Sequence, residues 1–334
     1  MRKLISVLTM FCLAAVAFTA VAEPVSRISP VRPVSTYSIV ARDPVTGDMG
    51  VAVQSHWFSV GAVVPWARSG VGAVATQSMV DPSYGPLGLE LMAAGRSAEA
   101  TLAALLLADE HSDIRQVGMV DAKGISVSHT GKRCIEAAGH VVGDGFAVQA
   151  NLMGPDTVPA AMAEAYRKAD GALAERMVAA LAAAQAEGGD IRGRQSAAMI
   201  VVRAEPSGQT WNDVLVDLRV EDHPDPVVEL KRLLRLHRGY EQMNAGDLAV
   251  EKNDLEGAET AYAAAESILG DNLEARYWHA VAMVNAGEID RALPIFAAIF
   301  AKGDNWRILT PRLVESGFLE ADPETLARIM AAGE

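Results

Sequence analysis

The 334-residue chain is half apolar and holds 29 basic against 42 acidic residues, which gives a formal net charge of −13 at pH 7. An acidic chain repels nucleic acid and anionic lipid, so neither is expected as a partner. The length and the apolar fraction are sufficient for a sizeable core and suggest two domains.

The first 22 residues have the pattern of a secretory signal peptide. Arg2 and Lys3 precede an apolar run over residues 4–18, and an Ala-Val-Ala sequence ends at residue 22. This pattern predicts cleavage after Ala22 and a periplasmic or secreted product without a membrane span. An uncleaved N-terminal anchor is the alternative. Cleavage leaves Cys134 as the one remaining cysteine, so no intramolecular disulfide is expected.

The next segments predict a Pro-rich linker and then alternating groups of strands and helix pairs. Three prolines in residues 23–34 indicate the linker. Period-2 alternation and turn residues delimit the strands, and capping residues delimit the helices. Strands are predicted over residues 36–41, 49–55, 60–67 and 71–77, helices over 86–95 and 97–108, strands over 116–121, 125–129 and 145–151, helices over 155–168 and 173–187, and strands over 196–204 and 214–220.

This order predicts an α+β fold over residues 35–222. Helices that come in pairs between groups of strands disfavour right-handed parallel βαβ units. Two antiparallel sheets, each with one face on the other sheet and one face under a helix pair, cover every apolar surface. The expected architecture is therefore a four-layer αββα sandwich.

After a polar boundary at residues 221–226 the chain is predicted to be helical to its end, so residues 226–334 form a small all-α domain. Small and aromatic residues recur there with a period that resembles tetratricopeptide repeats. Helices near residues 227–237 and 323–331 are expected to cap the repeats, whose concave face could hold a protein partner. A shift of 34 residues aligns Gly246 with Ala280, Leu255 with Ile289, Ala258 with Ala292, and Tyr262 with Phe296.

Four blocks of the chain resemble the Domain of Unknown Function 1028 family. The blocks are residues 36–44, 61–67, 70–77 and 193–198. The family is grouped by fold with the N-terminal-nucleophile hydrolases, so the resemblance implies the αββα sandwich. It implies no substrate, because the family has no settled one and a fold alone does not define a function.

The resemblance implies that Thr36 is a candidate nucleophile. In such hydrolases a Thr, Ser or Cys stands first on a strand after cleavage, and its own α-amine takes the proton of its hydroxyl. An α-amine with a pKa of about 7.7–8.0 is a usable base at neutral pH. Cleavage after Ala22 leaves thirteen residues ahead of Thr36, so a second cut is needed. The alternative is a strand residue without chemistry.

Other polar residues lie at predicted strand ends, where they could face a shared cleft. Gln77 could donate to an oxyanion, or could fix the loop that follows it. Ser55, His56 and Thr76 are candidate substrate-binding residues, with a loop serine and a surface histidine as the alternative. Neighbours on a strand point to opposite faces, so Ser55 and His56 do not form a nucleophile and base pair.

Arg194 is a further candidate, because a guanidinium at a sheet edge could hold a substrate carboxylate. A structural ion pair with Asp190 is the alternative. His129, His140 and Asp144 have no spacing typical of a metal site, and no glycine loop is typical of a phosphate site, so neither metal nor cofactor is expected.

Two functions follow as hypotheses. The first is an exported amidohydrolase of the N-terminal-nucleophile type that cleaves a peptide or a small amide. The second is a non-catalytic binding or assembly protein of the cell envelope, whose ligand is a peptide, a protein partner or peptidoglycan. The oligomeric state is left open.

Overall fold

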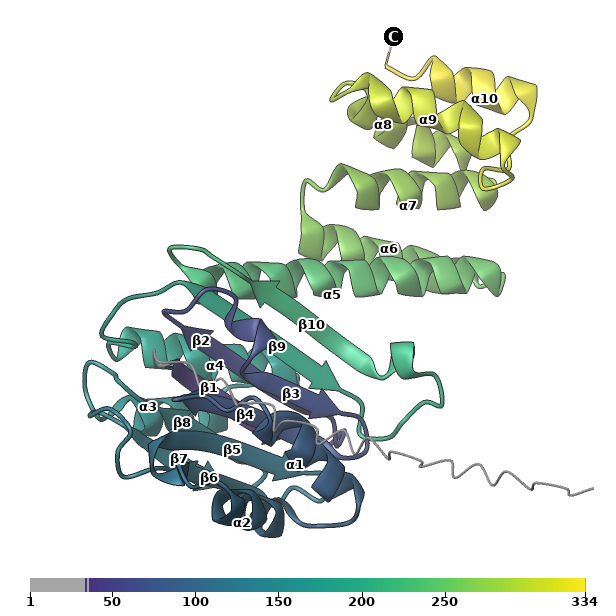
Figure 1. The fold of residues 1–334 in the computed structure, drawn as a ribbon. Coiled ribbons are helices and arrows are strands. Elements are labelled where there is room, and N and C mark those ends of the chain that lie inside the picture. The colour runs from purple at the N-terminus through teal and green to yellow at the C-terminus, as the bar shows by residue number, and fades with distance from the viewer. Residues whose placement is uncertain (1–33, 35, 334) are drawn as a thin grey trace, which may run out of the picture.

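The structure is a computed structural model that describes residue 34 and residues 36–333. They form a mixed α+β fold with antiparallel sheets, followed by an all-helical C-terminal region (Figure 1). The predicted α+β class with trailing helices is therefore confirmed. The predicted signal peptide, residues 1–22, and the linker up to residue 33 lie outside the described residues.

The strands form two antiparallel sheets. The six-stranded sheet has the order β10-β9-β2-β1-β8-β7, and the four-stranded sheet has the order β3-β4-β5-β6. The strands are β1 (Thr36–Arg42), β2 (Met49–Ser55), β3 (Pro65–Arg68), β4 (Gly72–Ser78), β5 (Arg115–Asp121), β6 (Ser126–Thr130), β7 (Gly139–Gly143), β8 (Phe146–Ala150), β9 (Ser196–Val202) and β10 (Val214–Val220).

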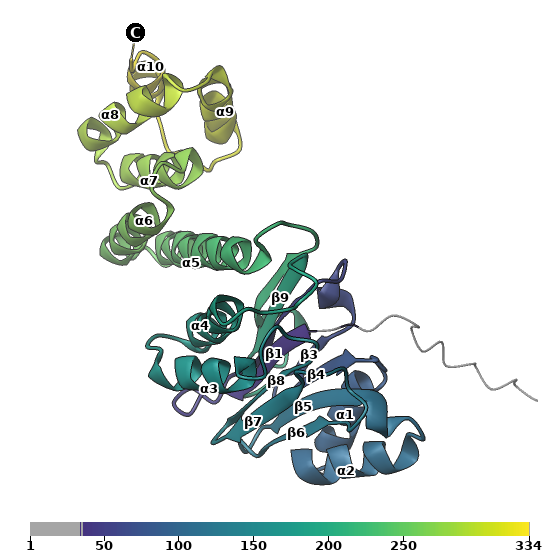
Figure 2. The ribbon, with the colours of Figure 1, turned by 90° about the vertical axis from the view of Figure 1, so that its left-hand side faces the viewer.

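The two sheets pack face to face, and helix pairs cover their outer faces (Figure 2). Helices α1 (Tyr84–Ala93) and α2 (Ala98–Ala108) pack on the four-stranded sheet. Helices α3 (Val158–Lys168) and α4 (Leu173–Ala186) pack on the six-stranded sheet. Both faces of the central strands are thereby shielded, as their long runs of buried residues require, whereas the edge strands β7 and β10 are partly exposed.

One strand prediction is wrong, and one strand was missed. Residues Val60–Ala62 form a 3-10 turn, so the strand expected over 60–67 is only β3. The turn packs closely on β9, since a Cβ on Gly61 would lie 2.9 Å from the Cβ of Ala198. Strand β7 was not predicted, because it is a short edge strand with a glycine at each end.

Helix α5 (Pro226–Glu251) is a single helix of 26 residues, whereas a separate capping helix was expected over 227–237. Leu230 and Leu234 belong to the core that also contains α3 and α4. Arg238 donates from Nε and Nη2 to the two carboxylate oxygens of Glu175 on α4, at 2.8 and 3.1 Å. The first half of α5 therefore belongs with the sheets, and its second half belongs with the C-terminal helices.

Two of the remaining helices, α6 and α8, begin 34 residues apart. Helices α6 and α8 start at Leu255 and Ile289, and the aligned aromatic residues Tyr262 and Phe296 are both buried. None of the helices in the described part of the chain combines the length and apolar character that a membrane crossing requires. The other helices are α6 (Leu255–Leu269), α7 (Leu273–Asn285), α8 (Ile289–Phe300), α9 (Asp304–Glu315) and α10 (Pro323–Met330).

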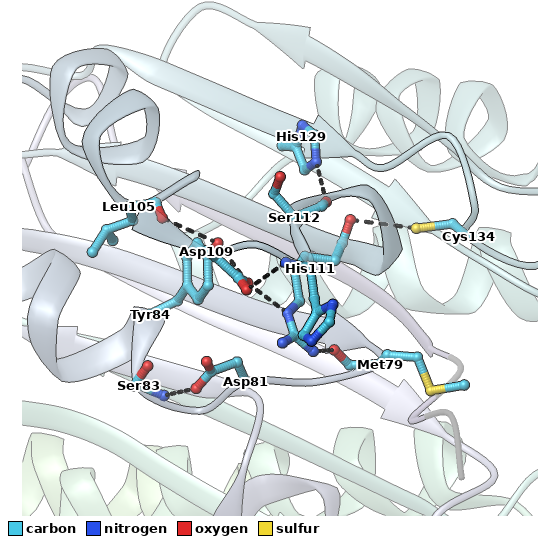
Figure 3. Close-up of polar contacts among 11 residues, drawn as sticks. Met79, Asp81, Ser83, Tyr84, Leu105, Asp109, His111, Ser112, His129 and Cys134 are labelled. Carbon is cyan, nitrogen blue, oxygen red and sulfur yellow. Dashed lines mark hydrogen bonds and ion pairs between the residues drawn. The ribbon is translucent and has the colours of Figure 1, made fainter. Parts of the chain in front are cut away.

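A buried ion pair anchors the start of β5 (Figure 3). Arg115 Nε lies 2.7 Å from Asp109 Oδ2, and the two side chains are 3% and 6% exposed. The Tyr84 hydroxyl donates to the same oxygen at 3.1 Å, and Arg115 Nη1 donates to the carbonyl oxygen of Met79 at 2.5 Å. Burial alone would raise the pKa of Asp109, but hydrogen bonds from Arg115 and from the His111 N–H outweigh burial and hold this pKa below its ordinary value.

Removal of the guanidinium should destabilise the protein strongly. Arg115→Met leaves the Asp109 carboxylate buried without its cation, which costs about 3–5 kcal/mol of unfolding free energy. Urea unfolding measures the loss. Arg68→Met is the matched control, because Arg68 and Glu90 form an ion pair with side chains that are 40% and 69% exposed, and such pairs contribute about 0–1 kcal/mol. Equal losses in the two variants would contradict this assignment.

The same pair predicts a pH dependence of stability. The pKa of Asp109 is lower in the folded state than in the unfolded state. The ionised carboxylate therefore makes its full contribution to the unfolding free energy above the unfolded pKa of about 3.9, and this contribution is lost as the pH falls through the folded pKa. The difference in unfolding free energy between wild type and Asp109→Asn should therefore shrink from neutral pH to about pH 3. Denaturant titrations along this pH series measure it, and a constant difference would show that Asp109 is not the ionised partner.

Candidate functional site

Polar side chains from both sheets lie between the sheets, at the end where β1 begins. The other end of this layer is apolar, with Val40, Val51 and Val120 in its core. Alternate residues of a strand share a face, which places Thr36 and Ser38 together on the inner face of β1. We call the set the inter-sheet polar cluster, and it consists of Thr36, Ser38, Gln149 and Asn151 from the six-stranded sheet and its extension, and Gln77, Gln116 and Ser128 from the four-stranded sheet.

Gln77 lies at the centre of this cluster and joins the two sheets. Its Oε1 accepts from the Ser38 hydroxyl at 2.6 Å. Its Nε2 donates to Gln116 Oε1 at 2.6 Å, and to the main-chain oxygens of Thr36 and Gln149 at 3.2 and 3.3 Å. A buried amide is costly unless its hydrogen bonds are made, so these contacts fix the position of one sheet on the other.

The other amides of the cluster complete the network except at one atom. Gln149 Nε2 donates to the Ser38 hydroxyl at 2.6 Å, and Asn151 Nδ2 donates to Gln116 Oε1 at 2.9 Å. Asn151 Oδ1 is buried and has no hydrogen-bond partner among the described residues. Buried polar atoms are almost always paired, so this oxygen marks a place where a ligand donor could bind.

Thr36 is fully buried at the start of β1. Its hydroxyl donates to the carbonyl oxygen of Val34 at 2.7 Å, and its own carbonyl oxygen accepts from the Asn151 N–H at 3.1 Å. Val34 forms two main-chain hydrogen bonds with Ser78 of the four-stranded sheet, at 2.8 and 3.0 Å. The chain ahead of Thr36 therefore pairs with the opposite sheet, and the Thr36 nitrogen is an amide rather than a base.

An open cavity of about 590 Å³ lies beyond the end of β8, where Leu152 in its lining follows Asn151 in the chain. Its lining includes Ala137, Leu152, Met153 and Ile191. Ala137 and Leu152 both have φ of 57°, a left-handed conformation that is strained for residues other than glycine. Such strain concentrates at functional sites, which supports this end of the sandwich as the candidate site.

Of the polar residues predicted at strand ends, the structure brings Ser55 and Gln77 close to Thr36 but directs Thr76 elsewhere. Ser55 is buried and is the register partner of Thr36 on the neighbouring strand. The Thr76 hydroxyl donates to the carbonyl oxygen of Val63 at 2.7 Å, on the face of β4 opposite to Gln77.

His56 and Arg194 lie outside the cluster. The His56 N–H donates to Asp190 Oδ2 at 3.2 Å, and its ring Nδ1 is buried without a partner among the described residues. Arg194 forms an ion pair with Asp225, and both side chains are about half exposed. The ion pair of Asp190 is made by Arg192, with Nη2 2.8 Å from Oδ2.

Sequence reasoning missed Gln116, Gln149 and Asn151. The available signal was their placement, because Gln149 and Asn151 lie in and directly after an otherwise apolar strand, and Gln116 precedes the apolar part of β5. Gln116 Nε2 also donates to the Thr130 hydroxyl at 2.9 Å, and that hydroxyl lies 2.8 Å from His140 Nδ1. Burial and the neighbouring His129 lower the pKa of His140, so its ring is neutral at neutral pH.

The thiol of Cys134, which lies in the same region, is not activated. Burial raises the pKa of the Cys134 thiol, whose Sγ lies 3.3 Å from the carbonyl oxygen of Arg115. Among residue 34 and residues 36–333, no three His, Cys, Asp or Glu side chains lie close enough together to hold a metal ion. The polar groups at this end of the sandwich are hydroxyls, amides and main-chain groups.

Comparison with known proteins agrees with the division of the chain into a part that contains the two sheets and a C-terminal helical region. The model of a family of unknown function, DUF1028, matches residues 36–230. The chain belongs to this family. The match begins at Thr36 and ends inside α5 at Leu230, one of the residues of that helix that join the sandwich core. The resemblance noted from the four sequence blocks is thus confirmed.

A solved structure of the same family is similar to this chain. It is the crystal structure of protein SPO2555 from Silicibacter pomeroyi, with 29% sequence identity and a TM-score of 0.55. The similarity covers 64% of this chain and 88% of that one. No curated protein matches the chain.

Loss of the central amide should destabilise the sandwich. Gln77→Leu removes one donor from Gln116 Oε1 and from the main-chain oxygens of Thr36 and Gln149, and it removes the acceptor of the buried Ser38 hydroxyl. Each buried polar group left unsatisfied costs about 1–3 kcal/mol. Chemical unfolding measures the change. Gln209→Leu is the control, because Gln209 is exposed and surface substitutions change stability by about 0.5 kcal/mol or less. A Gln77→Leu protein as stable as wild type would show that the network does not hold the sheets together.

Proposed function

We propose that this chain is the precursor of an N-terminal-nucleophile hydrolase that cleaves an amide bond in a peptide or a small acyl compound. The observation that carries the proposal is the position of Thr36, a hydroxyl residue that heads β1 inside a buried polar cluster between two sheets. The order of helix pair, sheet, sheet and helix pair supports the likeness to that class of hydrolase. The family match that starts at Thr36 supports the same boundary.

The chain as it stands is latent, because the Thr36 nitrogen lies in a peptide bond and the hydroxyl is buried against Val34. Removal of the residues ahead of Thr36 would create a free α-amine. It would also remove the pairing between Val34 and Ser78. With Val34 the Thr36 hydroxyl would lose the carbonyl oxygen to which it donates. Thr36 would then face the space vacated by its own precursor segment.

In the processed chain the freed amine takes the hydroxyl proton while Thr36 Oγ1 attacks the substrate carbonyl carbon. The same proton passes to the leaving nitrogen as the C–N bond breaks, and water then hydrolyses the Thr36 ester. Gln77 acts as a positioning residue, since its Nε2 is directed at Gln116 Oε1 and at main-chain oxygens. Asn151 Nδ2 donates to Gln116 with one hydrogen and keeps a second for an oxyanion.

We further propose that the protein is exported to the periplasm or secreted, on the signal-peptide pattern of residues 1–22. The helical region from α5 to α10 is proposed to be tetratricopeptide-like, on the recurrence of starts and buried aromatics after 34 residues. The alternative function is a non-catalytic binding or assembly protein. The complete burial of Thr36 in the uncut chain and the cavities in the helical region favour this alternative.

The deciding experiment compares a chain that begins at Thr36 with a chain that begins at Glu23. Each is treated with a β-lactone, which acylates an activated threonine hydroxyl, and intact mass is measured. We expect an adduct at Thr36 in the shorter chain alone, because only its threonine has a free amine. Thr36→Ser should retain the adduct and Thr36→Ala should lose it. Absence of any adduct from a folded chain that begins at Thr36 would shift the assignment to the binding function.

A further inference from the structure

The helical region contains two adjoining cavities, which we call the acidic groove. They have volumes of about 260 and 320 Å³. Val250 of α5, Tyr262 of α6 and Ala282 of α7 line both of them. The groove thus lies where the end of α5 meets α6 and α7, away from the half of α5 that packs on the sheets.

The groove has a strong local excess of negative charge. Five carboxylates are among the residues that line the two cavities, Asp247, Glu251, Glu256, Glu259 and Glu288, and none of these lining residues is lysine or arginine. Of the carboxylates that line the cavities, Glu259 and Glu288 are paired with Arg291. Glu251 and Glu256 line the cavities without an ion pair among the described residues. Their uncompensated charge makes the groove attractive to cations.

His279 supplies an independent indication of a ligand. It lines the first cavity, is only 7% exposed, and its Nε2 has no hydrogen-bond partner among the described residues. Its Nδ1 lies 2.5 Å from Glu266 Oε1. In the neutral ring Nδ1 donates to this carboxylate, which leaves Nε2 as an acceptor that requires a donor.

The wall around His279 is rigid. Its ring stacks on Tyr262 with centroids 5.6 Å apart, and the Tyr262 hydroxyl donates to Asp247 at 2.6 Å. The groove also has an apolar side, because Phe318 lines the second cavity and is 64% exposed. A ligand that satisfies all of these features has cationic groups, hydrogen-bond donors and apolar side chains.

We infer that the acidic groove binds an extended segment of a partner protein in which lysine or arginine lies beside apolar residues. A peptide supplies N–H donors for His279 Nε2, cations for Glu251 and Glu256, and side chains that cover Phe318. A small polyamine supplies cations and N–H donors, but it has no apolar side chain to cover Phe318. The inference does not depend on the hydrolase proposal, because none of these residues lies near Thr36.

The test is fluorescence anisotropy with the full chain and a labelled peptide of about ten residues that contains lysines and phenylalanines in Gly-Ser spacers. We expect saturable binding that weakens about tenfold from about 50 to about 500 mM salt, because screening reduces charge attraction. A peptide with glutamate in place of lysine should not bind. Failure of the lysine peptide to bind folded protein would overturn the inference.

Matched double variants separate the groove from general charge. Glu251→Gln with Glu256→Gln should weaken binding about tenfold. Glu315→Gln with Glu324→Gln removes the same charge from exposed positions of α9 and α10, and should leave the affinity unchanged. Equal weakening in the two double variants would show non-specific attraction and overturn the site.

A third variant tests the histidine contact. His279→Asn keeps a polar group near the position of Nδ1 and removes Nε2, so affinity should fall several-fold while binding of the glutamate peptide stays absent. Thermal unfolding of the variant confirms that it is folded. Unchanged affinity in a folded His279→Asn protein, with unchanged affinity in Glu251→Gln and Glu256→Gln, would place the peptide elsewhere.

Discussion

The buried amide of Gln77 is the contact on which the position of the candidate site depends. Apolar side chains at the other end of the inter-sheet layer tolerate small shifts, because hydrophobic burial is non-directional. The amide does not, since its donors and acceptor must meet Gln116, Ser38 and the oxygen of Thr36 within hydrogen-bond distance. One arrangement of the two sheets satisfies these bonds, and that arrangement sets Thr36 at the entrance of the polar layer.

The strand β5 transmits this constraint to the helices on the outer face. Arg115 and Gln116 are neighbours, so their side chains point to opposite faces. Gln116 enters the inter-sheet cluster, while Arg115 forms the buried ion pair with Asp109, which also accepts from Tyr84 of α1. A shift of β5 would break polar contacts on both faces at once. Such contacts specify the register of β5 more than they add to net stability.

Local sequence signals were sufficient for most of the elements but not for their tertiary partners. Alternation and turn residues delimit β10 over Val214–Val220 as expected, because that strand has one partly exposed face. The same signals predicted a strand over residues 60–67 that is longer than β3. Residues Val60–Ala62 form a turn instead, and Gly61 in this turn packs against Ala198. The continuity of α5 was missed, because no local signal shows that Leu230 packs in a core with α4. Thr36 was identified from its strand start and the family resemblance, whereas Asn151 depends on contacts across the sheets.

The continuous α5 also determines how the two candidate sites relate. Its first half is fixed to the sandwich by Leu230, Leu234 and the bidentate bond from Arg238 to Glu175. Its last turns form one wall of the acidic groove through Val250 and Glu251. A helix without an internal break transmits position along its length, so a partner bound in the groove is held at a fixed place relative to the sheets. A continuous α5 therefore favours a groove that holds its partner in a fixed position beside the sandwich. It disfavours a groove that moves independently of the sandwich.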